Sequence, residues 1–310
     1  MPSTLLDIQL AAKTIAAGEL VGFPTETVYG LGADAASDAA VAKIFAAKGR
    51  PSDHPLIVHV ASPSLVPYFA SEVPAFAHKL IAAFWPGPLT VILPRKPGVA
   101  SASAGGQASI GLRCPSHKTA LSLLRECQKL GVQGVSAPSA NRFGRVSPTS
   151  AAHVREEFGS DLMILDGGDC DVGIESTIVD CTRGVPILLR PGAFTLKMLA
   201  EACAERVWLP DALSSLAPKA SGTLASHYAP RAKVSLISLA HAATYDGKHH
   251  AAAGSIALYQ LPADPVVAAH ELFAKLRDYD LSGVDQIWVT EPPLGEAWDG
   301  VRDRLTRAAA

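Results

Sequence analysis

The 310-residue sequence predicts an α/β protein in two parts, a larger mixed sheet over about residues 1–205 and a smaller parallel unit over residues 233–310. In the first part, short apolar segments of strand length mix irregularly with helical segments, and several strands follow one another directly, which is typical of a mixed sheet. In the second part strands and helices alternate, as they do in parallel sheets. The intervening residues 206–232 lack clear periodicity and are rich in proline, which predicts a long linker.

The elements of the first part follow from apolar spacing and from residues that begin or end helices. Ser37 or Asp38 is placed to cap a helix that ends at Lys48, and Gly18 ends the helix before it. A polar loop over 24–32 and a loop rich in Gly, Ser and Ala over 95–108 lie between regular elements. We expect helices over 4–17, 37–48, 74–84 and about 117–130. We expect strands over 20–23, 57–61, 89–93, 109–113 and 134–137.

Later elements are predicted in the same way. Ser147-Pro148 carries a helix start signal, with Ser147 as N-cap and Pro148 as the first helical residue, and Thr195 begins another helix. Three short apolar runs between these helices predict strands over 162–165, 177–181 and 186–190. In the second part we expect strands over 234–239, 254–261 and 286–290, and helices over 264–278 and 296–308.

Composition excludes several classes of protein. The net charge of −2 provides no broad basic surface for nucleic acid or anionic membranes, so any basic site must be local. Five cysteines without a CxxC pair favour a reducing compartment over a disulfide framework, and they exclude a zinc site built from cysteine. The N-terminus lacks the pattern of a signal peptide, and no run of 18 apolar residues occurs. We therefore expect a cytoplasmic protein that does not span a membrane.

The segment Lys48–Val60 is the most unusual in the sequence. Lys48, Gly49 and Arg50 are followed by two prolines four residues apart and then by an apolar strand that contains His59. Prolines that hold the chain extended would stiffen the two cations, which suits an anion such as a nucleotide phosphate. The alternative is an ordinary helix C-terminus with Gly49 in the C′ position. For His59 alone, a buried core histidine is the more common case.

Other polar residues collect where strands end, which is where ligand sites form in open α/β sheets. Arg113 and Arg190 close strands and would suit a carboxylate or phosphate, although an ion pair between domains is the alternative. Asn141, the only asparagine, suits recognition of a base or ribose, or else forms an Asx turn. Glu26 and Glu175 would hold Mg²⁺ through water, orient an amine, or cap backbone amides.

Known phosphate-binding and catalytic motifs are absent from the sequence. It contains no GxxxxGK[ST], GxGxxG, HExxH or GxSxG segment, so a P-loop, a dinucleotide fingerprint and a serine nucleophile elbow are excluded. The remaining polar residues are cations and hydroxyls without an evident covalent nucleophile. This pattern fits nucleotidyl transfer, in which positioning and charge stabilisation provide most of the catalysis.

Seven segments of the chain resemble, in order, those of the YrdC/Sua5 family. They are PTETVYGLG (24–32), KGRPSDHPLIVHV (48–60), WPGPLT (85–90), SIGLRCP (109–115), SAPSANRFGRVSPT (136–149), IESTIVD (174–180) and ILLRPG (187–192). The linker segment His227-Tyr228-Ala229-Pro230 and the second part are similar to the longer, two-domain type. The resemblance implies a YrdC-like twisted mixed sheet over 1–205, a linker or lid over 206–232, and a smaller Rossmann-like α/β domain over 233–310.

The resemblance also implies an activity. Members of the family make threonylcarbamoyl-adenylate and pyrophosphate from L-threonine, bicarbonate or CO₂, and ATP with Mg²⁺. Partner proteins then transfer the threonylcarbamoyl group to adenosine 37 of tRNA. Transferred by position, the residues of the L-threonine pocket would be Thr27, His59, Arg113, Ser139 and Ser176. The residues of the ATP side would be Lys48, Arg50, His54, Ser109, Asn141, Ser147, Arg190 and Tyr228.

Within these assignments Lys48 and Arg50 would be catalytic, and no residue is assigned to a metal. His54 departs from the family's Asn-Pro-Leu pattern, so its role depends on a side chain whose charge varies near neutral pH. Three alternatives to the synthase are a module that binds double-stranded RNA or tRNA, a related carbamoyl-adenylate enzyme of hydrogenase maturation, and an inactive regulatory paralogue. The modest net charge disfavours the RNA-binding module. The hydrogenase-maturation enzyme is disfavoured because its further domains are not found in this sequence, and the inactive paralogue is disfavoured because the full set of motifs is present.

Overall fold

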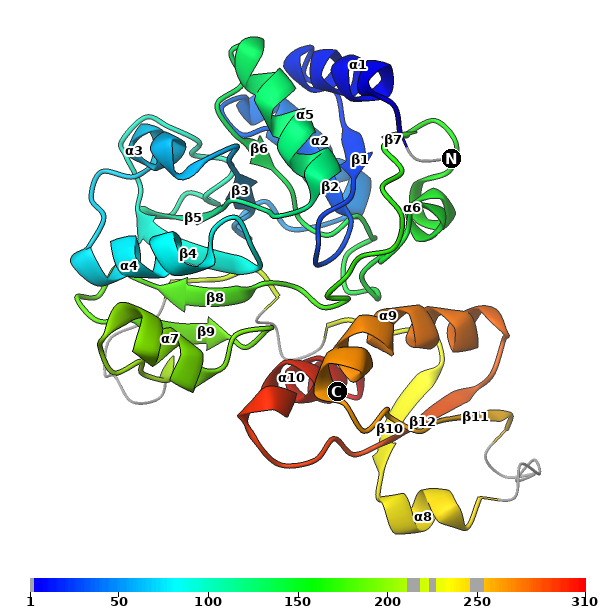
Figure 1. Ribbon diagram of the computed structural model, residues 1–310. Coiled ribbons are helices and arrows are strands. Elements are labelled where there is room, and N and C mark those ends of the chain that lie inside the picture. Colours follow the sequence, from blue (N-terminus) through cyan, green and yellow to red (C-terminus); the bar gives the residue numbers. More distant parts are fainter. Residues whose placement is uncertain (1–2, 211–217, 223–226, 246–253) are drawn as a thin grey trace.

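The computed structural model describes residues 3–210, 218–222, 227–245 and 254–310 (Figure 1). Its larger sheet has nine strands in the order β7-β1-β2-β6-β3-β5-β4-β8-β9. The pairs β1–β7, β3–β5 and β4–β8 are parallel and the others antiparallel, which confirms the predicted mixed sheet. The strands are β1 Val21–Phe23, β2 Gly30–Asp34, β3 Ile57–His59, β4 Leu89–Pro94, β5 Ser109–Arg113, β6 Val135–Ser136, β7 Met163–Ile164, β8 Thr177–Asp180 and β9 Ile187–Arg190.

Helices cover the two faces of this sheet unequally. One face packs against α1, α4, α5 and α7 in the largest hydrophobic cluster, and α1 lies beside α5 at the top of Figure 1. The opposite face meets only two helices among the described residues, α2 at β2 and α6 at β1 and β7, in a smaller cluster that includes Leu31, Ile44 and Val154. The helices are α1 Leu5–Ala16, α2 Asp38–Lys48, α3 Val66–Phe69, α4 Ala75–Phe84, α5 Lys118–Lys129, α6 Ala151–Phe158 and α7 Leu196–Cys203.

Strand alternation leaves polar side chains on the less covered face. In β5, Ile110 and Leu112 enter the largest cluster, so Ser109 and Arg113 point to the other side. In β3, Val58 enters the same cluster, so His59 points the same way as Arg113. These two residues are direct partners in the parallel β3–β5 pair. The pleat alone therefore brings two residues 54 positions apart in sequence to one site.

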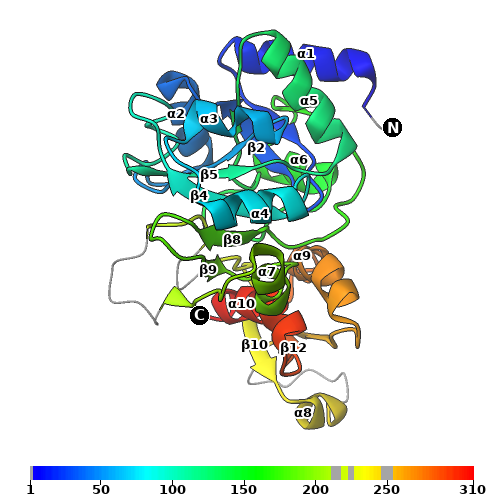
Figure 2. The same ribbon diagram turned by 60° about the vertical axis from the view of Figure 1, so that its left-hand side comes forward.

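The second part is a three-stranded parallel sheet in the order β10-β12-β11, as predicted. In Figures 1 and 2 its helices α9 and α10 lie between this sheet and the nine-stranded sheet, and α8 lies at the far end. A hydrophobic cluster joins Phe273, Trp298 and Leu305 of this part to Val28 and Val146 of the first part. The elements are β10 Lys233–Ile237, α8 Leu239–Ala243, β11 Ile256–Tyr259, α9 Pro265–Leu281, β12 Gln286–Thr290 and α10 Asp299–Ala308.

The structure corrects several predicted elements. Ser147 is not an N-cap: Ser150 accepts the amide of His153, and α6 begins at Ala151, because the Ser147 hydroxyl is engaged elsewhere. Gly30–Gly32, expected within a loop, belongs to β2, which pairs on both sides. Helices α3 and α8 were not predicted. Parts of the predicted 206–232 linker, 211–217 and 223–226, lie outside the described residues.

Other start signals were read correctly. Ser37 caps α2 and Thr195 caps α7, each accepting a backbone amide in the first turn of its helix. Gly49 follows α2 with φ of 64°, the left-handed conformation of a C-terminal glycine. Among the described residues all five cysteines are buried and unpaired, and none of the helices is long and apolar enough to cross a membrane.

Candidate active site

A pocket of about 490 Å³ lies on the less covered face of the large sheet. Strand residues form its floor, and the linker residues Ser221, Gly222, His227 and Tyr228 line it as well. Eight of the residues that the resemblance assigns to the two substrates are brought together here, and Glu175 lies among them. The eight are Thr27, Arg50, His59, Arg113, Ser139, Ser176, Arg190 and Tyr228.

One end of the pocket is built around Arg113. Its Nη1 donates to Thr27 Oγ1 at 2.8 Å, and its Nη2 lies 2.7 Å from Glu26 Oε1 as an ion pair. That contact lacks hydrogen-bond geometry, so Nη2, Nε and both Glu26 oxygens are without hydrogen-bond partners. His59 beside it is buried, and burial together with the Arg113 charge lowers its pKa to about 3. His59 is therefore neutral at pH 7.

The other end contains Arg190, Arg50 and Tyr228. Arg190 donates from Nε and Nη2 to the Ser176 carbonyl and from Nη1 to the Ser221 carbonyl, so it ties β9 to the linker. Arg50 donates to the Pro55 carbonyl at 2.9 Å, while its Nε has no partner. Burial, with Arg190 nearby, lowers the pKa of Arg50 to about 10, so it keeps its charge at pH 7.

Tyr228 adopts an unusual backbone conformation to reach the pocket. Its φ of 64° is in the left-handed region, which is uncommon for a residue with a side chain. Its ring packs against His227 and Phe273, with centroids 4.1 and 5.3 Å away, and its hydroxyl has no partner. Gly222 makes room for that hydroxyl, because a Cβ there would lie 2.4 Å from it and 2.6 Å from Arg190 Nη1.

Lys48, Asn141 and Ser147 do not line the pocket but lie behind its wall. Lys48 is buried and donates from Nζ to the carbonyls of Ser139, at 2.6 Å, and of Asn141. Asn141 Nδ2 donates to the carbonyls of Arg142 and Arg145, and Asn141 Oδ1 has no hydrogen-bond partner among the described residues. Burial first, and then the Arg50 charge, hold the pKa of Lys48 well below its usual range. These residues shape the Ser139–Ser147 loop.

His54 and Ser109 line two further cavities that adjoin the main pocket. His54 faces a cavity of about 710 Å³ shared with Arg50 and His227, and its ring meets Phe143 edge-on at 5.5 Å. Burial and the Arg50 charge lower the pKa of His54. Ser109 lines a cavity of about 300 Å³ that shares Ile57 and Ser221 with the main pocket.

Unpartnered buried atoms cluster at this site. Among the described residues, the buried side-chain atoms without a hydrogen-bond partner include Arg50 Nε, Arg113 Nε, His59 Nδ1, His227 Nδ1 and the Tyr228 hydroxyl, and all five residues line the main pocket. Buried polar groups in proteins are nearly always satisfied, so such a cluster indicates that a polar ligand completes it. Three arginines line the pocket, against Glu175 as the one carboxylate among the described lining residues and Glu26, which pairs with Arg113. The positive charge that remains favours an anion.

Sequence reasoning missed several residues that shape the site. Glu175 was considered for a metal, an amine or a backbone cap, whereas it accepts from Ser147 Oγ and from Arg304 Nε. Arg304 belongs to no motif singled out from the sequence, and no local pattern could reveal its role because its partner Glu175 lies 129 residues earlier in the chain. Gly222 stands among loop residues, and only its contacts reveal why it is glycine.

Comparison with known proteins identifies the family. A family model described as "Telomere recombination", covering the Sua5, YciO and YrdC proteins, matches residues 13–192, and a model described as "Threonylcarbamoyl-AMP synthase, C-terminal domain" matches residues 194–310. The threonylcarbamoyl-AMP synthase of Pyrococcus abyssi is 39% identical over 97% of this chain and 94% of its own length. The enzyme of the same name from Schizosaccharomyces pombe is 36% identical over 94% of this chain and 85% of its length.

Solved structures agree with this comparison. The crystal structure of P. abyssi Sua5 complexed with L-threonine matches all of this chain and 96% of its own, with a TM-score of 0.87 and 35% identity. E. coli YciO, at 20% identity and a TM-score of 0.54, shares the fold of the first part. The expected fold, a YrdC-like mixed sheet followed by a smaller α/β unit, is thereby confirmed. The chain belongs to the Sua5/YciO/YrdC family, and its second part matches the separate C-terminal domain of threonylcarbamoyl-AMP synthases.

Proposed function

We propose that this protein is an L-threonylcarbamoyladenylate synthase, which converts L-threonine, bicarbonate or CO₂, and ATP to threonylcarbamoyl-AMP and pyrophosphate. The observation that carries the proposal is the cationic pocket, in which buried Arg50, Arg113 and Arg190 meet unpaired polar atoms. The unpaired arginine donors of such a pocket would be satisfied by a carboxylate and a triphosphate. The relatives that bear the synthase name cover nearly the whole chain.

The pocket has two chemically different ends, which suit two substrates. We assign L-threonine to the end with Thr27, His59 and Arg113, where Nε and Nη2 of Arg113 would pair with its carboxylate. Ser139 and Ser176 would complete this subsite. We assign ATP to the end with Arg50, Arg190 and Tyr228 and to the adjoining cavities that His54 and Ser109 line. Lys48, Asn141 and Ser147 would support the ATP subsite from behind its wall.

This arrangement suits the chemistry in two steps. The neutral amine of threonine attacks CO₂ and loses a proton, which gives a carbamate. A carbamate oxygen then attacks the α-phosphorus of ATP as the bond to the bridging oxygen of the leaving pyrophosphate breaks. His59 is neutral and buried beside Arg113, so it would orient the amino acid through its ring nitrogens without adding a further positive charge to the subsite. The arginines would offset the charge that builds on the phosphates.

We further propose that Mg²⁺ enters with ATP. Among the described residues no group of three or more His, Cys, Asp or Glu side chains is arranged to hold a metal ion. Glu175 is close to the pocket, but its two oxygens already accept from Ser147 and Arg304. Mg²⁺ is commonly held by substrate phosphates with few protein ligands, and it would offset their negative charge. The donor set fits a metal carried by the nucleotide.

Several wider assignments also belong to this proposal. The domain bounds would be a catalytic unit over 1–205, a lid over 206–232 and a C-terminal unit over 233–310. The product, threonylcarbamoyl-AMP, would pass to the proteins that modify adenosine 37 of tRNA. The protein would be cytoplasmic and would contact tRNA or other double-stranded RNA. The contacts of Ser221 and Tyr228 with the pocket support the lid.

The test is release of pyrophosphate by the purified protein. We expect release from Mg²⁺–ATP that requires both L-threonine and bicarbonate, with threonylcarbamoyl-AMP detected by mass spectrometry. Omission of each substrate in turn is the control. Release that does not depend on threonine would contradict the proposal, and binding of double-stranded RNA without turnover would favour the binding module instead.

A further inference from the structure

Two arginines of the C-terminal part reach into the first part and are buried there. Arg304 of α10 is fully buried and Arg277 of α9 is 6% exposed. A buried cation is costly unless it is paired and hydrogen-bonded, so its partners reveal why it is present. The partners of both arginines belong to the wall of the pocket or lie directly behind it.

Arg304 holds the segment that carries Glu175. Its Nε donates to Glu175 Oε2 at 2.9 Å, Nη2 donates to the Glu175 carbonyl at 3.0 Å, and Nη1 donates to the Pro191 carbonyl at 2.6 Å. Its guanidinium also lies 5.6 Å from the centre of the Tyr228 ring. One side chain thus fixes both the carboxylate and the backbone of a residue that lines the pocket, and it contacts the tyrosine of the linker.

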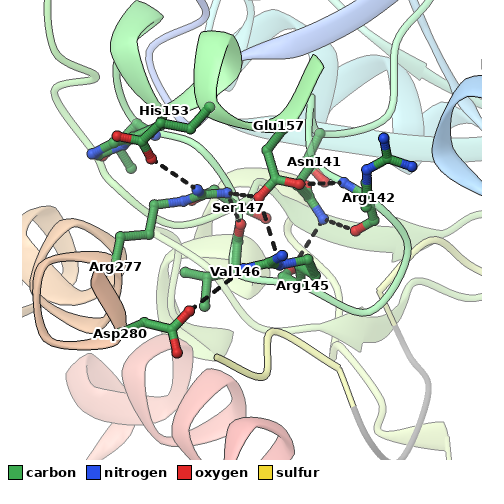
Figure 3. A network of polar contacts seen from close by, with 12 residues as sticks. Asn141, Arg142, Arg145, Val146, Ser147, His153, Glu157, Arg277 and Asp280 are labelled. Atoms are coloured by element: carbon green, nitrogen blue, oxygen red, sulfur yellow. Dashed lines mark hydrogen bonds and ion pairs between the residues drawn. The ribbon is translucent and has the colours of Figure 1, made fainter. Parts of the chain in front are cut away.

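Arg277 holds the neighbouring loop, as Figure 3 shows. Its Nη2 donates to the Val146 carbonyl and to Glu157 Oε1 at 2.9 Å, and its Nε donates to the Ser147 carbonyl at 3.4 Å. Glu157 in turn accepts the amide of Arg142 at 3.0 Å. Asp280, one turn further along α9, pairs with Arg145 at 3.4 Å. The helix therefore fixes the loop from Arg142 to Ser147 at several points.

The two sets of contacts converge on Ser147. Its carbonyl accepts from Arg277, and its hydroxyl donates to Glu175, whose other oxygen accepts from Arg304. Arg304 also supplies much of the positive charge that compensates Glu175, together with Arg190. Without Arg304, a buried carboxylate with less compensation would face the subsite to which we assign the triphosphate, and repulsion would oppose nucleotide binding.

We propose that Arg277 and Arg304 are positioning residues, through which the C-terminal part orders the Ser147–Glu175 wall of the nucleotide subsite. The inference rests on the proposed synthase function. It gives the C-terminal part a role in the reaction although none of its described residues lines the main pocket. Because the arginines act on one end of the pocket, their loss affects ATP more than L-threonine.

The experiment compares Arg304→Met, Arg304→Lys, Arg277→Met and Arg277→Lys with the full-length wild type. Pyrophosphate release gives KM for each substrate, and calorimetry gives the dissociation constants of L-threonine and of a non-hydrolysable ATP analogue with Mg²⁺. We expect each Met variant to raise KM and Kd for the nucleotide at least tenfold, with L-threonine values within about twofold of wild type. The Lys variants keep the charge but not the planar set of donors, so they recover only part of the affinity.

Arg302→Met is the matched control, because Arg302 lies on the same helix but contacts Asp299 and the carbonyls of Pro293 and Gly295. It should leave all constants unchanged. Unchanged nucleotide constants in folded Met variants would overturn the inference, and so would an equal loss for both substrates. If the Met variants do not fold, the Lys variants decide on the same criteria. A wild type that binds the nucleotide but releases no pyrophosphate refutes the synthase function, and the binding constants still test the arginines.

Discussion

At the residue scale, Arg113 is the side chain most clearly prepared for a ligand. It is 4% exposed, it donates to Thr27, and its ion pair with Glu26 leaves Nε and Nη2 without hydrogen bonds. Its strand partner His59 adds an unpaired nitrogen on the same side of the sheet. A carboxylate would satisfy two of these donors at once, which a water molecule does less well.

We therefore expect Arg113→Ala to weaken L-threonine far more than ATP. Loss of a charge-assisted pair costs about 1.5–3 kcal/mol, which corresponds to roughly 10- to 150-fold in Kd. Titration calorimetry with each ligand separately measures the two effects. Arg113→Lys retains a charge that compensates Glu26, so it serves as a folded comparison and should lose less. Equal weakening of both ligands would contradict the assignment of Arg113 to the amino acid.

At the element scale, the start of α6 shows what local sequence can and cannot predict. Both Ser147 before Pro148 and Ser150 before Ala151 satisfy the rules for an N-cap. Ser147 does not cap the helix because its hydroxyl donates a hydrogen bond to Glu175, which lies 28 residues away in sequence. Ser37 and Thr195 meet no such competitor, and their helices begin as predicted. Arg277 and Arg304 were not predicted because their partners also lie far away in sequence, 120 and 129 residues respectively. Arginines on amphipathic helices usually face solvent, so the local pattern gave no sign of their burial.

The two serines should separate stability from activity. Ser150→Ala removes the cap of α6 and should lower the free energy of unfolding by about 1 kcal/mol, with KM for ATP unchanged. Ser147→Ala leaves a buried Glu175 oxygen without its hydroxyl donor and should raise KM for ATP severalfold. Urea denaturation and pyrophosphate release measure the two quantities. An unchanged free energy of unfolding in Ser150→Ala would contradict the cap assignment, and an unchanged KM in Ser147→Ala would contradict its link to the ATP subsite.

At the scale of the whole molecule, the two sheets and the linker share one site and one buried interface. Tyr228 belongs to the hydrophobic cluster that contains Phe273 and Trp298, and it also lines the pocket. His227 next to it is buried, and burial lowers its pKa to about 4. His59, on the large sheet, has a pKa of about 3 for the same main reason. Both are neutral groups that the folded protein prevents from taking a proton.

This arrangement predicts a loss of stability in acid to which His59 and His227 contribute. In the unfolded chain each histidine titrates near 6.5, whereas the folded values are about 4 for His227 and about 3 for His59. The unfolded state therefore binds more protons below pH 6.5. The contribution of each histidine is present above that pH and is lost as pH falls toward the folded values. Each costs at most about 1.4 kcal/mol per pH unit within its window.

We expect the free energy of unfolding, measured by urea denaturation from pH 7.5 to pH 4.5, to fall less steeply below pH 6.5 in His59→Gln and in His227→Gln than in the wild type. The double variant should be flatter than either, because the side chains lie on different elements and titrate separately. His78→Gln, on the exposed face of α4, is the control and should follow the wild-type curve. Carboxylates contribute equally to all variants, so the difference between curves isolates the histidines. Parallel curves for wild type and double variant would show that neither histidine resists protonation in the folded protein.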